Sequence, residues 1–578
     1  MPHKNIVILG AGYGGLEAAK TLHKKLKDLD NVTIQLIDQN REHVLLTELH
    51  EVAGNRVNKD GVKVSIDHVL QYTKVEFIQD RITGADLKNK ILYSKDRQYP
   101  FDYIILACGS EPAYFNIPGM KENAFSLWSL EDAVKIKNHI IEMFQLADKE
   151  QSREKRQQLL TFVVGGGGFT GVEMMGELIE WTATLCGEYN IPKSEVKLVL
   201  VEALSRILCV LNDKLVNKSV KYLKKKGVEI LTDSPITNVE KDKVYINDEK
   251  VINTHTLIWT GGIQAKEFTK DLGLTLKARN RIEVNDRLQT KEFPYVYAIG
   301  DNCFLADDKG TAMPPLVEAA LQSGECAAHN IAAEIKGGDK KSLKPNLHGV
   351  MISIGSWFAV ANIMGMNMSG FLATIMKHLV NMHYLFGIGG FELIVDYINH
   401  QFINKERKYS FVVDHGISHI KVKTFTFWLS ILRVFFGIMW LRSGLEKLHG
   451  GWLEVGDQLV SGASVMAGIG DAPGWYQNIF FNIIEPNALL FQHLVVITEI
   501  ALGLAFIAGF FTVLAALVSI GMNINFYLTG GGDPWFLMTS IIMLGGAGRA
   551  FGLDYYIMPY LQRLVRYYGR NKRIKLKI

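Results

Sequence analysis

The sequence predicts an α/β protein with two doubly wound, parallel-sheet domains, followed by an all-α bundle of membrane-spanning helices. Two observations predict the α/β part: a strand–glycine turn–helix pattern at residues 5–20, and its return at residues 160–178. The third observation is a series of long apolar stretches after residue 425. These stretches belong to a chain with 48% hydrophobic residues and a mean hydropathy of +0.09, high values for a soluble protein.

Length and composition exclude several classes of function. A chain of 578 residues should hold several domains, and its net charge of +4, from 63 basic and 59 acidic residues, argues against a nucleic-acid partner. The five cysteines form no C-x-x-C pair and have no metal-like spacing, which excludes a dithiol relay and a structural zinc site, so no metal is expected. No signal peptide precedes the first strand, so we expect the N-terminal part in the cytoplasm.

The first pattern begins with the apolar strand 5–9, which runs into Gly10-Ala11-Gly12-Tyr13-Gly14-Gly15 and then into a helix. This is the context in which G-x-G-x-x-G indicates dinucleotide binding. Gly10 makes the tight turn, Gly12 lets the backbone approach a pyrophosphate, and Gly15 lets the helix pack on the strand. Tyr13 and Gly14 belong to the same binding loop, and the pyrophosphate is expected at the helix N-terminus.

Two further segments complete the first domain. The apolar strand 32–37 ends in Asp38, at the distance from the glycines where a ribose-binding carboxylate belongs. The apolar segment 102–110 ends in small residues that include Gly109, which adds a candidate cofactor contact.

The second pattern repeats the first. The strand 160–164 leads into a glycine loop in which Gly166, Gly168 and Gly171 keep the G-x-G-x-x-G spacing, and Thr170 lies within it. The following strand, 196–201, ends in Glu202, a second candidate for a ribose diol. A carboxylate there repels a 2′-phosphate, which favours NADH over NADPH, although Arg206 nearby weakens that expectation.

Two later segments close the two domains. The segment 256–262 ends in Gly261 and Gly262, and the apolar segment 295–301 ends in Gly300 and Asp301. A strand ending in Gly-Asp is where two-domain flavoproteins return to the FAD domain, with the Asp near the ribityl and phosphate part of the flavin. We therefore expect two Rossmann-like domains whose nucleotides meet across a cleft.

The stretch to about Phe402 resembles the type II NADH dehydrogenases, which are single-chain, non-pumping NADH:quinone oxidoreductases. The matching segments are residues 10–15, 47–53, 168–173, 258–262 and 298–301. The resemblance implies non-covalent FAD, hydride transfer from NADH to FAD, and electron transfer to a quinone from the bilayer. Menaquinone or demethylmenaquinone is the expected quinone, and the resemblance leaves open whether the chain forms a homodimer.

The resemblance also implies three catalytic candidates, Glu173, Glu318 and Gln322. Glu173 would lie beside the nicotinamide and the flavin and coordinate hydride transfer with proton movement; an ordinary helix glutamate is the alternative. Family members usually carry two glutamines, four residues apart, that line the quinone site. Here Glu318 occupies the first position and Gln322 the second, on one helix face. The acid could alter quinone preference or protonate a reduced quinone; a solvated helix acid is the alternative.

The residues between His348 and Phe402 are apolar and rich in Met and Gly. By resemblance this region forms amphipathic helices that lie on the bilayer and open the quinone path, whereas ordinary core is the alternative. A charged linker with Lys405, Arg407 and Lys408 follows.

Four apolar runs follow the linker, at residues 425–441, 494–511, 513–528 and 535–544. The last is short, so four crossings are expected and three are the alternative. No Lys or Arg occurs between Lys447 and Arg549, while both flanks are basic, which places both ends of the chain in the cytoplasm. The basic tail favours anionic lipid headgroups or acts only as a topology signal.

This last part resembles the DoxX-like four-helix membrane family, on residues 432–437, 443–448, 499–504 and 546–549 with Asp554. Arg433 and Glu499 are ionisable residues within apolar runs, and we expect them to pair, either to hold helices together or to bracket a quinone headgroup.

The expected domains are therefore an FAD-binding domain at 1–115 with a return segment at 290–345, an NADH-binding domain at 116–289, a membrane-surface region and linker at 346–415, a transmembrane bundle at 420–558 and a basic cytoplasmic tail at 559–578. The expected location is the cell membrane. Two alternatives stay open: a reductase for a non-quinone or extracellular acceptor, and a bundle that mainly docks another membrane enzyme. Sulfide:quinone reductases share the fold but need cysteines near the flavin, a role that cannot be assigned to Cys303.

Overall fold

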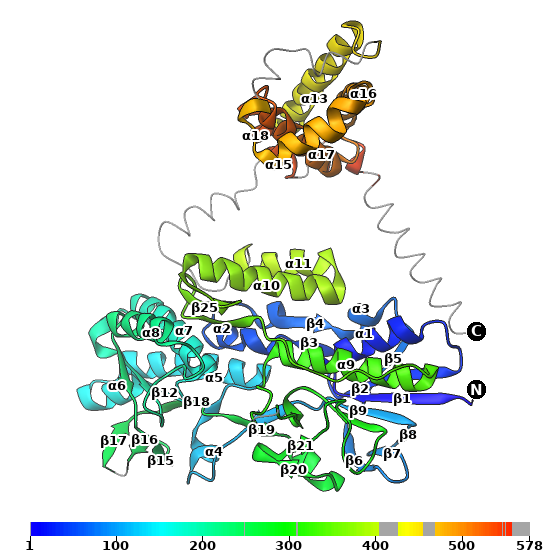
Figure 1. The fold of residues 1–578 in the computed structure, drawn as a ribbon. Coiled ribbons are helices and arrows are strands. Elements are labelled where there is room, and N and C mark those ends of the chain that lie inside the picture. The colour runs from blue at the N-terminus through cyan, green and yellow to red at the C-terminus, as the bar shows by residue number, and fades with distance from the viewer. Residues whose placement is uncertain are drawn as a thin grey trace. The chain divides into compact units, whose positions relative to one another are not determined.

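The structure is a computed structural model that describes residues 2–247, 249–307, 310–403, 426–454, 469–545, 547–549, 551–555 and 557. The chain forms two compact units, Met1–Ile420 and Lys421–Ile578, and each is described by itself (Figure 1). Most of the predicted linker and the basic tail at 559–578 lie outside the described residues.

The first sheet of the N-terminal unit is parallel throughout, with the strand order β22-β9-β1-β2-β5. Its strands are β1 (Lys4–Leu9), β2 (Val32–Asp38), β5 (Val75–Gln79), β9 (Tyr103–Leu106) and β22 (Val296–Ala298). Ile6, Val7 and Ile8 of β1 are fully buried, as expected for a parallel sheet covered on both faces. The segment that precedes Gly300 thus joins the sheet that begins with the first glycine loop.

The second sheet repeats this architecture, with the order β11-β18-β12-β13-β14, again parallel. Its strands are β11 (Phe125–Ser126), β12 (Thr161–Gly165), β13 (Lys197–Val201), β14 (Val228–Leu231) and β18 (Thr256–Trp259). The helices that follow the two glycine loops are α1 (Tyr13–Leu26) and α7 (Phe169–Glu188). The two doubly wound domains predicted from the sequence are therefore present.

Smaller strand and helix elements surround these sheets. Antiparallel β10 (Ser110–Pro112) and β19 (Ile263–Ala265) form a separate pair that joins the two doubly wound parts. The remaining strands are β3 (Glu42–Val44), β4 (Lys63–Ser65), β6 (Ile82–Asp86), β7 (Ile91–Ser94), β8 (Gln98–Pro100), β15 (Ile236–Val239), β16 (Lys243–Ile246), β17 (Lys250–Asn253), β20 (Leu276–Lys277), β21 (Arg281–Glu283) and β23 (Cys303–Phe304). The remaining α-helices up to residue 336 are α2 (Leu49–Ala53), α3 (Ile66–Leu70), α4 (Met120–Asn123), α5 (Leu130–Lys149), α6 (Arg153–Leu159), α8 (Asp213–Lys225) and α9 (Val317–Lys336).

Glycine allows α9 to pack tightly on α1. A Cβ on Gly14 would lie 2.9 Å from the Ala320 carbonyl oxygen, and a Cβ on Gly324 would lie 2.3 Å from the Gly14 oxygen. The Gly300 amide donates to Ser323 Oγ at 3.0 Å, which ties the Gly-Asp turn to the same helix. The packing thus brings the turn at Gly300 and the first glycine loop to one helix.

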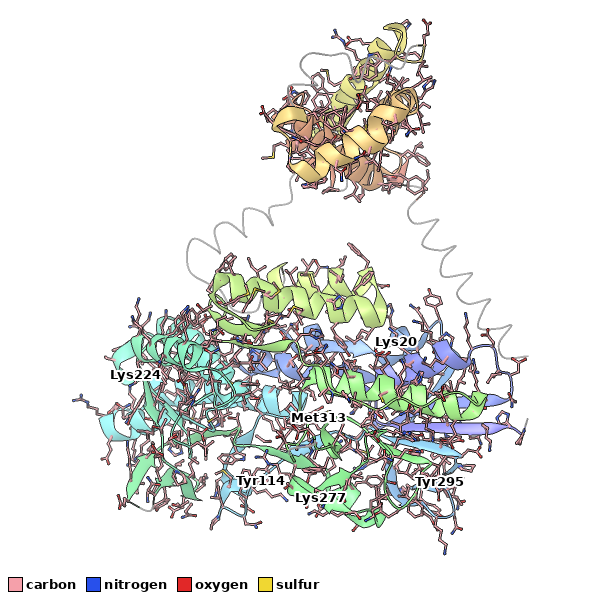
Figure 2. All side chains as sticks on the ribbon, viewed as in Figure 1. Lys20, Tyr114, Lys224, Lys277, Tyr295 and Met313 are labelled. Atoms are coloured by element: carbon pink, nitrogen blue, oxygen red, sulfur yellow. The ribbon has the colours of Figure 1, made fainter. Side chains whose placement is uncertain are left out.

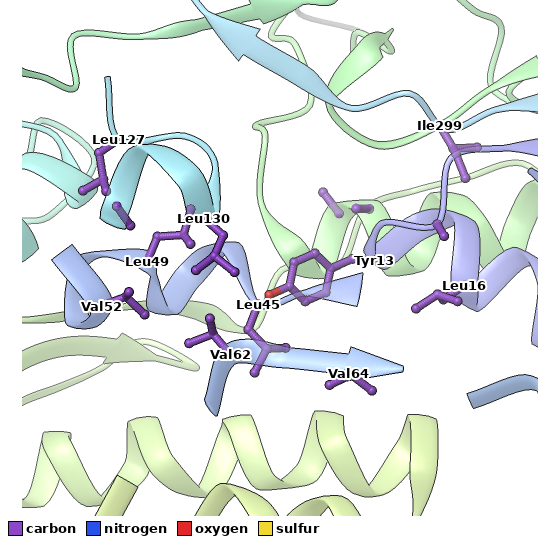
Figure 3. Packing of buried hydrophobic residues seen from close by; sticks show 14 of the residues in the cluster. Tyr13, Leu16, Leu45, Leu49, Val52, Val62, Val64, Leu127, Leu130 and Ile299 are labelled. Atoms are coloured by element: carbon purple, nitrogen blue, oxygen red, sulfur yellow. The ribbon is translucent and has the colours of Figure 1, made fainter. Parts of the chain in front are cut away.

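The core of the N-terminal unit extends beneath the first glycine loop. Figure 3 shows Tyr13 among Leu45, Val62 and other aliphatic side chains, with its ring directed away from the loop backbone. The ring also meets His43 edge-on, with centroids 4.8 Å apart. Tyr13 therefore packs α1 onto the β3–β4 region, and its contact with a cofactor stays a prediction.

The region after His348 corrects one expectation. Its first part is not helical: β24 (Gly349–Ser353), β25 (Ala359–Ile363) and β26 (Met366–Gly370) form an antiparallel sheet. Gly365 and Gly370, at positive φ, lie in the β25–β26 turn and at the end of β26, and Met364 and Met366 at that turn are exposed. Only Phe371 onward is helical, as α10 (Phe371–Gly389) and α11 (Phe391–Ile398), which pack side by side (Figure 1).

The C-terminal unit is helical where it is described. Its α-helices are α13 (Thr426–His449), α15 (Gly474–Ile479), α16 (Ala488–Ala508), α17 (Thr512–Leu528) and α18 (Pro534–Met543). Two described stretches are long and apolar enough to cross a membrane, Trp428–His449 and Gly474–Ala508. α17 and α18 are apolar but shorter, so four crossings stay a prediction. α13 and α16 pack closely at glycine, because a Cβ on Gly503 would lie 2.6 Å from Leu441 N.

Candidate functional site

Each glycine loop leaves an open approach to a helix N-terminus. Gly10 and Gly166 have φ of +110° and +107°, and a Cβ on either would collide with neighbouring backbone. At Gly12 and Gly168, in contrast, a Cβ would meet nothing within 4 Å. These two residues cap α1 and α7 without a side-chain hydrogen bond, and neither helix has an acid in its first turn. The free N–H groups and the open backbone fit a pyrophosphate in both places.

The two predicted ribose acids take the same position relative to their loops. Asp38 Oδ2 accepts a hydrogen bond from the Ala11 amide at 2.7 Å, and Glu202 Oε2 accepts one from the Gly167 amide at 2.6 Å. Both amides follow the first glycine of their motif. The acids therefore lie beside the open glycines, at the strand ends where a ribose diol is bound.

Of the other residues predicted to bind the cofactors, some lie in tightly packed surroundings and others are open to solvent. Gly15 and Gly171 are close-packing sites, because a Cβ on each would lie 1.9 Å from the carbonyl oxygen of the motif's first glycine. Thr170 is exposed beside the second loop, and Gly109 (φ +70°) has open space around its Cβ position. These surroundings leave room for a nucleotide at Thr170 and Gly109.

The segments 256–262 and 295–301, which were predicted to close the two domains, lie near the antiparallel pair β10–β19. A Cβ on Gly261 would meet the Trp259 ring, and Gly262 (φ +157°) faces Phe115. Asp301 accepts a hydrogen bond from Ser110 Oγ at 2.7 Å, and burial raises the pKa of Asp301 although Ser110 and Arg281 oppose that shift. Asp301 thus joins the Gly-Asp turn to the start of the strand pair between the domains.

Glu173 lies in the first turns of α7, directly after the second glycine loop. Its Oε1 accepts a hydrogen bond from the Ser353 amide at 3.3 Å, and its Oε2 lies 3.7 Å from His50 Nδ1. Burial raises the pKa of Glu173 to about 7. A carboxyl group with this pKa can take up or release a proton at neutral pH.

His50 connects Glu173 to a buried group of charges that the sequence did not reveal. Its Nε2 lies 3.2 Å from Ser353 Oγ and 3.9 Å from Glu51 Oε1. Burial, with Lys377 next in effect, keeps the pKa of His50 well below its ordinary value, so the ring is neutral at pH 7. A neutral imidazole has one donor nitrogen and one acceptor nitrogen, so His50 can form hydrogen bonds to a neighbour on each side.

Glu51 is the centre of that group, and its side chain is fully buried. Lys377 Nζ of α10 lies 2.5 Å from Glu51 and 3.3 Å from Glu48, while Arg56 Nη2 lies 2.7 Å from Glu51 and 2.8 Å from Glu177 of α7. Burial would raise the pKa of Glu51, but Arg56 and Lys377 lower it well below its ordinary range. Opposite charges therefore tie α2, α7 and α10 together.

The pKa of Glu48 is shifted in the opposite direction to that of Glu51. Burial, and then repulsion by Glu51, raises the pKa of Glu48 to about 8. Asn381 Nδ2 donates to Glu48 Oε1 at 2.8 Å and to Tyr397 Oη at 3.0 Å, and His378 Nδ1 lies 2.8 Å from the same hydroxyl. Two titratable carboxyl groups, Glu48 and Glu173, thus flank one ionised carboxylate. The acidic segment 47–53 was the available sequence signal, but its partners on α10 lie over 300 residues away.

Glu318 and Gln322 lie together, as their spacing predicted, and both bind one short segment. Glu318 Oε2 accepts a hydrogen bond from the His348 amide at 2.9 Å, and Oε1 contacts His348 Nδ1. Gln322 donates to Asn346 O at 2.7 Å and accepts from Asn346 N at 2.9 Å. They therefore anchor the segment before β24, whose end contacts Glu173.

Cysteines and potential metal ligands occur in the described part of the chain. All five cysteines lie in the described part and are free. Cys303 is fully buried, and burial raises its pKa to about 12, so its thiol is neutral at pH 7 and poorly suited to attack a sulfur substrate. Among the described residues, no three His, Cys, Asp or Glu side chains are grouped to hold a metal ion.

The predicted pairing of Arg433 with Glu499 is wrong. Arg433 donates to the carbonyl oxygens of Ala547 and Phe551, at 3.0 and 3.1 Å. Glu499 instead accepts from Lys447 Nζ, at 2.9 Å from each oxygen. The pairing failed because Arg433 lies near the start of α13 and Lys447 near its end, and Glu499 of α16 faces the latter.

Comparison with known proteins identifies both parts of the chain. The family described as pyridine nucleotide-disulphide oxidoreductase matches residues 4–324, and the family described as TQO small subunit DoxD matches residues 428–569. The second match confirms the resemblance to DoxX-like proteins.

Two relatives are each described as a type II NADH:quinone oxidoreductase. The one from Staphylococcus haemolyticus (strain JCSC1435) is 32% identical over 391 residues, which cover 67% of this chain and 96% of the relative. The one from Staphylococcus aureus (strain NCTC 8325 / PS 47) is 32% identical over 394 residues, 68% of this chain and 97% of the relative.

Two solved structures share the fold of the N-terminal part. NDH2 from Plasmodium falciparum in complex with NADH aligns with a TM-score of 0.63 at 17% identity, over 70% of this chain and all of that chain. The sulfide:quinone oxidoreductase from Aquifex aeolicus aligns with a TM-score of 0.55 at 16% identity, over 73% of this chain and 96% of that chain. These structures show the fold, and the two sequence relatives show that the chain belongs to the type II NADH:quinone oxidoreductases, a family of FAD-dependent enzymes that oxidise NADH.

Proposed function

We propose that this protein is a membrane-attached, non-proton-pumping NADH:quinone oxidoreductase that reduces a menaquinone-type quinone, menaquinone or demethylmenaquinone. NADH, one proton and the quinone give NAD⁺ and the quinol. The observation that carries the proposal is the pair of open glycine loops at helix N-termini, each backed by a carboxylate. FAD, when bound at the first loop, supplies the ability to accept a hydride and pass two electrons on.

In this proposal the two loops hold the two nucleotides. Asp38 binds the adenosine ribose of FAD and Glu202 that of NADH, while Gly12 and Gly168 admit the pyrophosphates. Asp301, held by Ser110, reaches the ribityl part of the flavin. The β10–β19 pair keeps the two domains in the orientation that brings nicotinamide to flavin, which is the positioning part of catalysis.

Glu173 is the proposed proton-handling residue of the NADH side. Its pKa of about 7 and its neighbours Ser353 and His50 support this role. Glu318 and Gln322 are the proposed residues of the quinone side. Their hold on residues 346–348 supports a role in shaping that site, and Glu318 replaces an amide with a group that can carry a proton.

Two features support attachment to a membrane. α10 and α11 expose large apolar side chains, among them Leu372, Phe386 and Phe391, next to the buried charge group. The C-terminal unit adds two helices long enough to span a bilayer. We propose a multi-pass bundle of four crossings with the catalytic domain and both ends in the cytoplasm, which the placement of Lys and Arg supports. The division into domains at 1–115, 116–289, 290–345, 346–415, 420–558 and 559–578 belongs to the same proposal.

The test uses the full-length protein in detergent and in lipid vesicles. We expect bound FAD, bleaching of the flavin by NADH under anaerobic conditions, and reoxidation by menaquinone in the vesicles. Bleaching by NADH without reoxidation by any quinone would instead favour another acceptor, with the bundle as a docking scaffold. A chain that binds no flavin would overturn the proposal.

A further inference from the structure

We propose that Asp213 holds Arg206 away from the adenosine ribose and so acts with Glu202 to make the chain select NADH over NADPH. The inference rests on the proposed function, because it concerns the nucleotide which that function oxidises. It assigns Asp213 as a positioning residue that acts through an arginine.

The loop between β13 and α8 lies directly on the second glycine loop. Glu202, at its start, accepts from the amides of Gly167 and Leu204, at 2.6 and 2.8 Å. The Leu208 amide then donates to Gly167 O at 2.8 Å, and a Cβ on Gly167 would lie 2.7 Å from Ile207. Arg206 precedes Ile207, so its backbone lies at the edge where the ribose of a bound nucleotide is expected.

The Arg206 guanidinium nevertheless binds elsewhere. Its Nη1 donates to Asp213 Oδ1 at 2.6 Å, and its Nη2 donates to Leu211 O at 2.5 Å. Asp213 is the first residue of α8, and that helix start is fixed by Asn212, whose side chain accepts from the Leu215 amide. α8 continues to Lys224 in its last turn, at the surface (Figure 2). The carboxylate that holds Arg206 therefore belongs to a regular, capped helix.

The charges explain how this affects nucleotide choice. A phosphate ester carries close to two negative charges at neutral pH, and a nearby arginine is the usual group that accommodates a ribose 2′-phosphate. Glu202 repels that phosphate, and Asp213 withholds the cation that would offset the repulsion. Because both side chains of the Arg206–Asp213 pair are exposed, Asp213 by 84%, the pair is weak, and its removal should shift selectivity without reversing it.

The experiment compares kcat/KM for NADPH and NADH in the full-length protein with a water-soluble quinone. In Asp213→Asn, the NADPH:NADH ratio should rise about two- to fivefold, through a lower KM for NADPH. The rise should disappear in the double variant with Arg206→Ala, and Asp213→Glu should keep the wild-type ratio. The affinity for adenosine 2′,5′-bisphosphate, measured by calorimetry, should rise in Asp213→Asn by the same factor.

The matched control is Glu195→Gln, which breaks another surface pair, between Arg156 Nε and Glu195 Oε2 at 2.7 Å. It should leave the ratio unchanged. An unchanged ratio in Asp213→Asn, or a rise that persists with Arg206→Ala, would overturn this inference while NADH oxidation continued. Failure of the wild-type protein to oxidise NADH would instead overturn the proposed function.

Discussion

Burial gives Glu173 a protonation state that changes within the physiological pH range. Its carboxyl group has a neutral histidine, His50, on one side and the Ser353 amide on the other. Glu51, beyond the histidine, stays charged because Arg56 and Lys377 face it. Neighbouring acids in one buried site thus have separated pKa values, an arrangement typical of sites that move protons.

Substitution Glu173→Gln tests this role through the pH dependence of turnover. The wild-type rate should change around pH 7, where Glu173 titrates, and the variant should lose that transition together with about 100-fold in kcat or more. KM for NADH should change less, because in the proposed function the residues of the second glycine loop, and not Glu173, bind the nucleotide. An unaltered transition near pH 7 would assign it to another group.

The same pKa has a consequence for stability. Since the folded pKa of Glu173, about 7, lies above its ordinary value of 4.5, the folded chain binds the proton more tightly, and stability falls as pH rises from about 4.5 to about 7. The thermal midpoint of Glu173→Gln should therefore gain on the wild type between about pH 5 and pH 7, and the difference should level off above that range. A constant difference between the two proteins would contradict this.

At the scale of elements, each glycine loop and the helix N-terminus that follows it form one structural motif, in which neighbouring glycines have different roles. Gly12 and Gly168 face open space, whereas Gly15 and Gly171 lie against backbone. Sequence patterns sufficed to predict these loops, because Gly15 and Gly171 contact the first glycine of their own motif and the two acids lie at the end of the next strand, 27 and 35 residues away. Contacts between elements were not predictable in the same way: Lys377 meets Glu51 across 326 residues.

The position of charged side chains along a helix set a second limit to prediction. Arg433 and Glu499 are both ionisable residues in apolar runs, yet each faces a different partner, because the pairing depends on where α13 and α16 cross. The sheet at residues 349–370 was missed for a similar reason. Its apolar, Met-rich composition suits a helix as well as a strand, and only the pairing of β25 with both neighbours decides between them.

Substitutions of three glycines in these loops distinguish the residues needed for nucleotide binding from those needed for folding. Gly12→Val should yield a folded protein without FAD, because its side chain enters the space a pyrophosphate needs. Gly168→Val should retain FAD and lose NADH binding. Gly15→Val should fail to fold, since its Cβ would lie 1.9 Å from Gly10 O. Flavin absorbance and thermal midpoint distinguish the three outcomes, and retained FAD in Gly12→Val would place the cofactor elsewhere.

The buried charges that join α2, α7 and α10 predict a large effect of Arg56→Met. Removal of Arg56 leaves Glu51 and Glu177 without their shared cation and should cost about 3–5 kcal/mol in unfolding free energy. Arg156→Met, which breaks a surface pair, should cost at most about 1 kcal/mol. Equal effects of the two substitutions in thermal unfolding would contradict the importance of the buried group.

At the scale of the whole molecule, the N-terminal unit has its own core, and hydrogen bonds connect that core to the apolar surface helix α10. Lys20 of α1, labelled in Figure 2, donates to the Gly387 carbonyl of α10. Tyr384 Oη of α10 lies 2.9 Å from His43 Nε2. His43 in turn contacts Ala11 O in the first glycine loop, at 3.1 Å. α10 is therefore connected through His43 to the first glycine loop within this unit.

A chain that ends after Ile420 should consequently keep bound FAD and reduce a water-soluble quinone with NADH, because that unit is compact by itself. Its membrane contact would be limited to the apolar faces of α10 and α11, which bind an interface reversibly. The truncated chain should leave vesicles at alkaline pH, whereas the full chain should need detergent, since both of the described stretches long enough to span the bilayer lie after Ile420. Vesicle flotation measures both. If the full chain is also released at alkaline pH, the C-terminal helices do not span the membrane. If the truncated chain loses quinone reduction, the C-terminal helices take part in electron transfer.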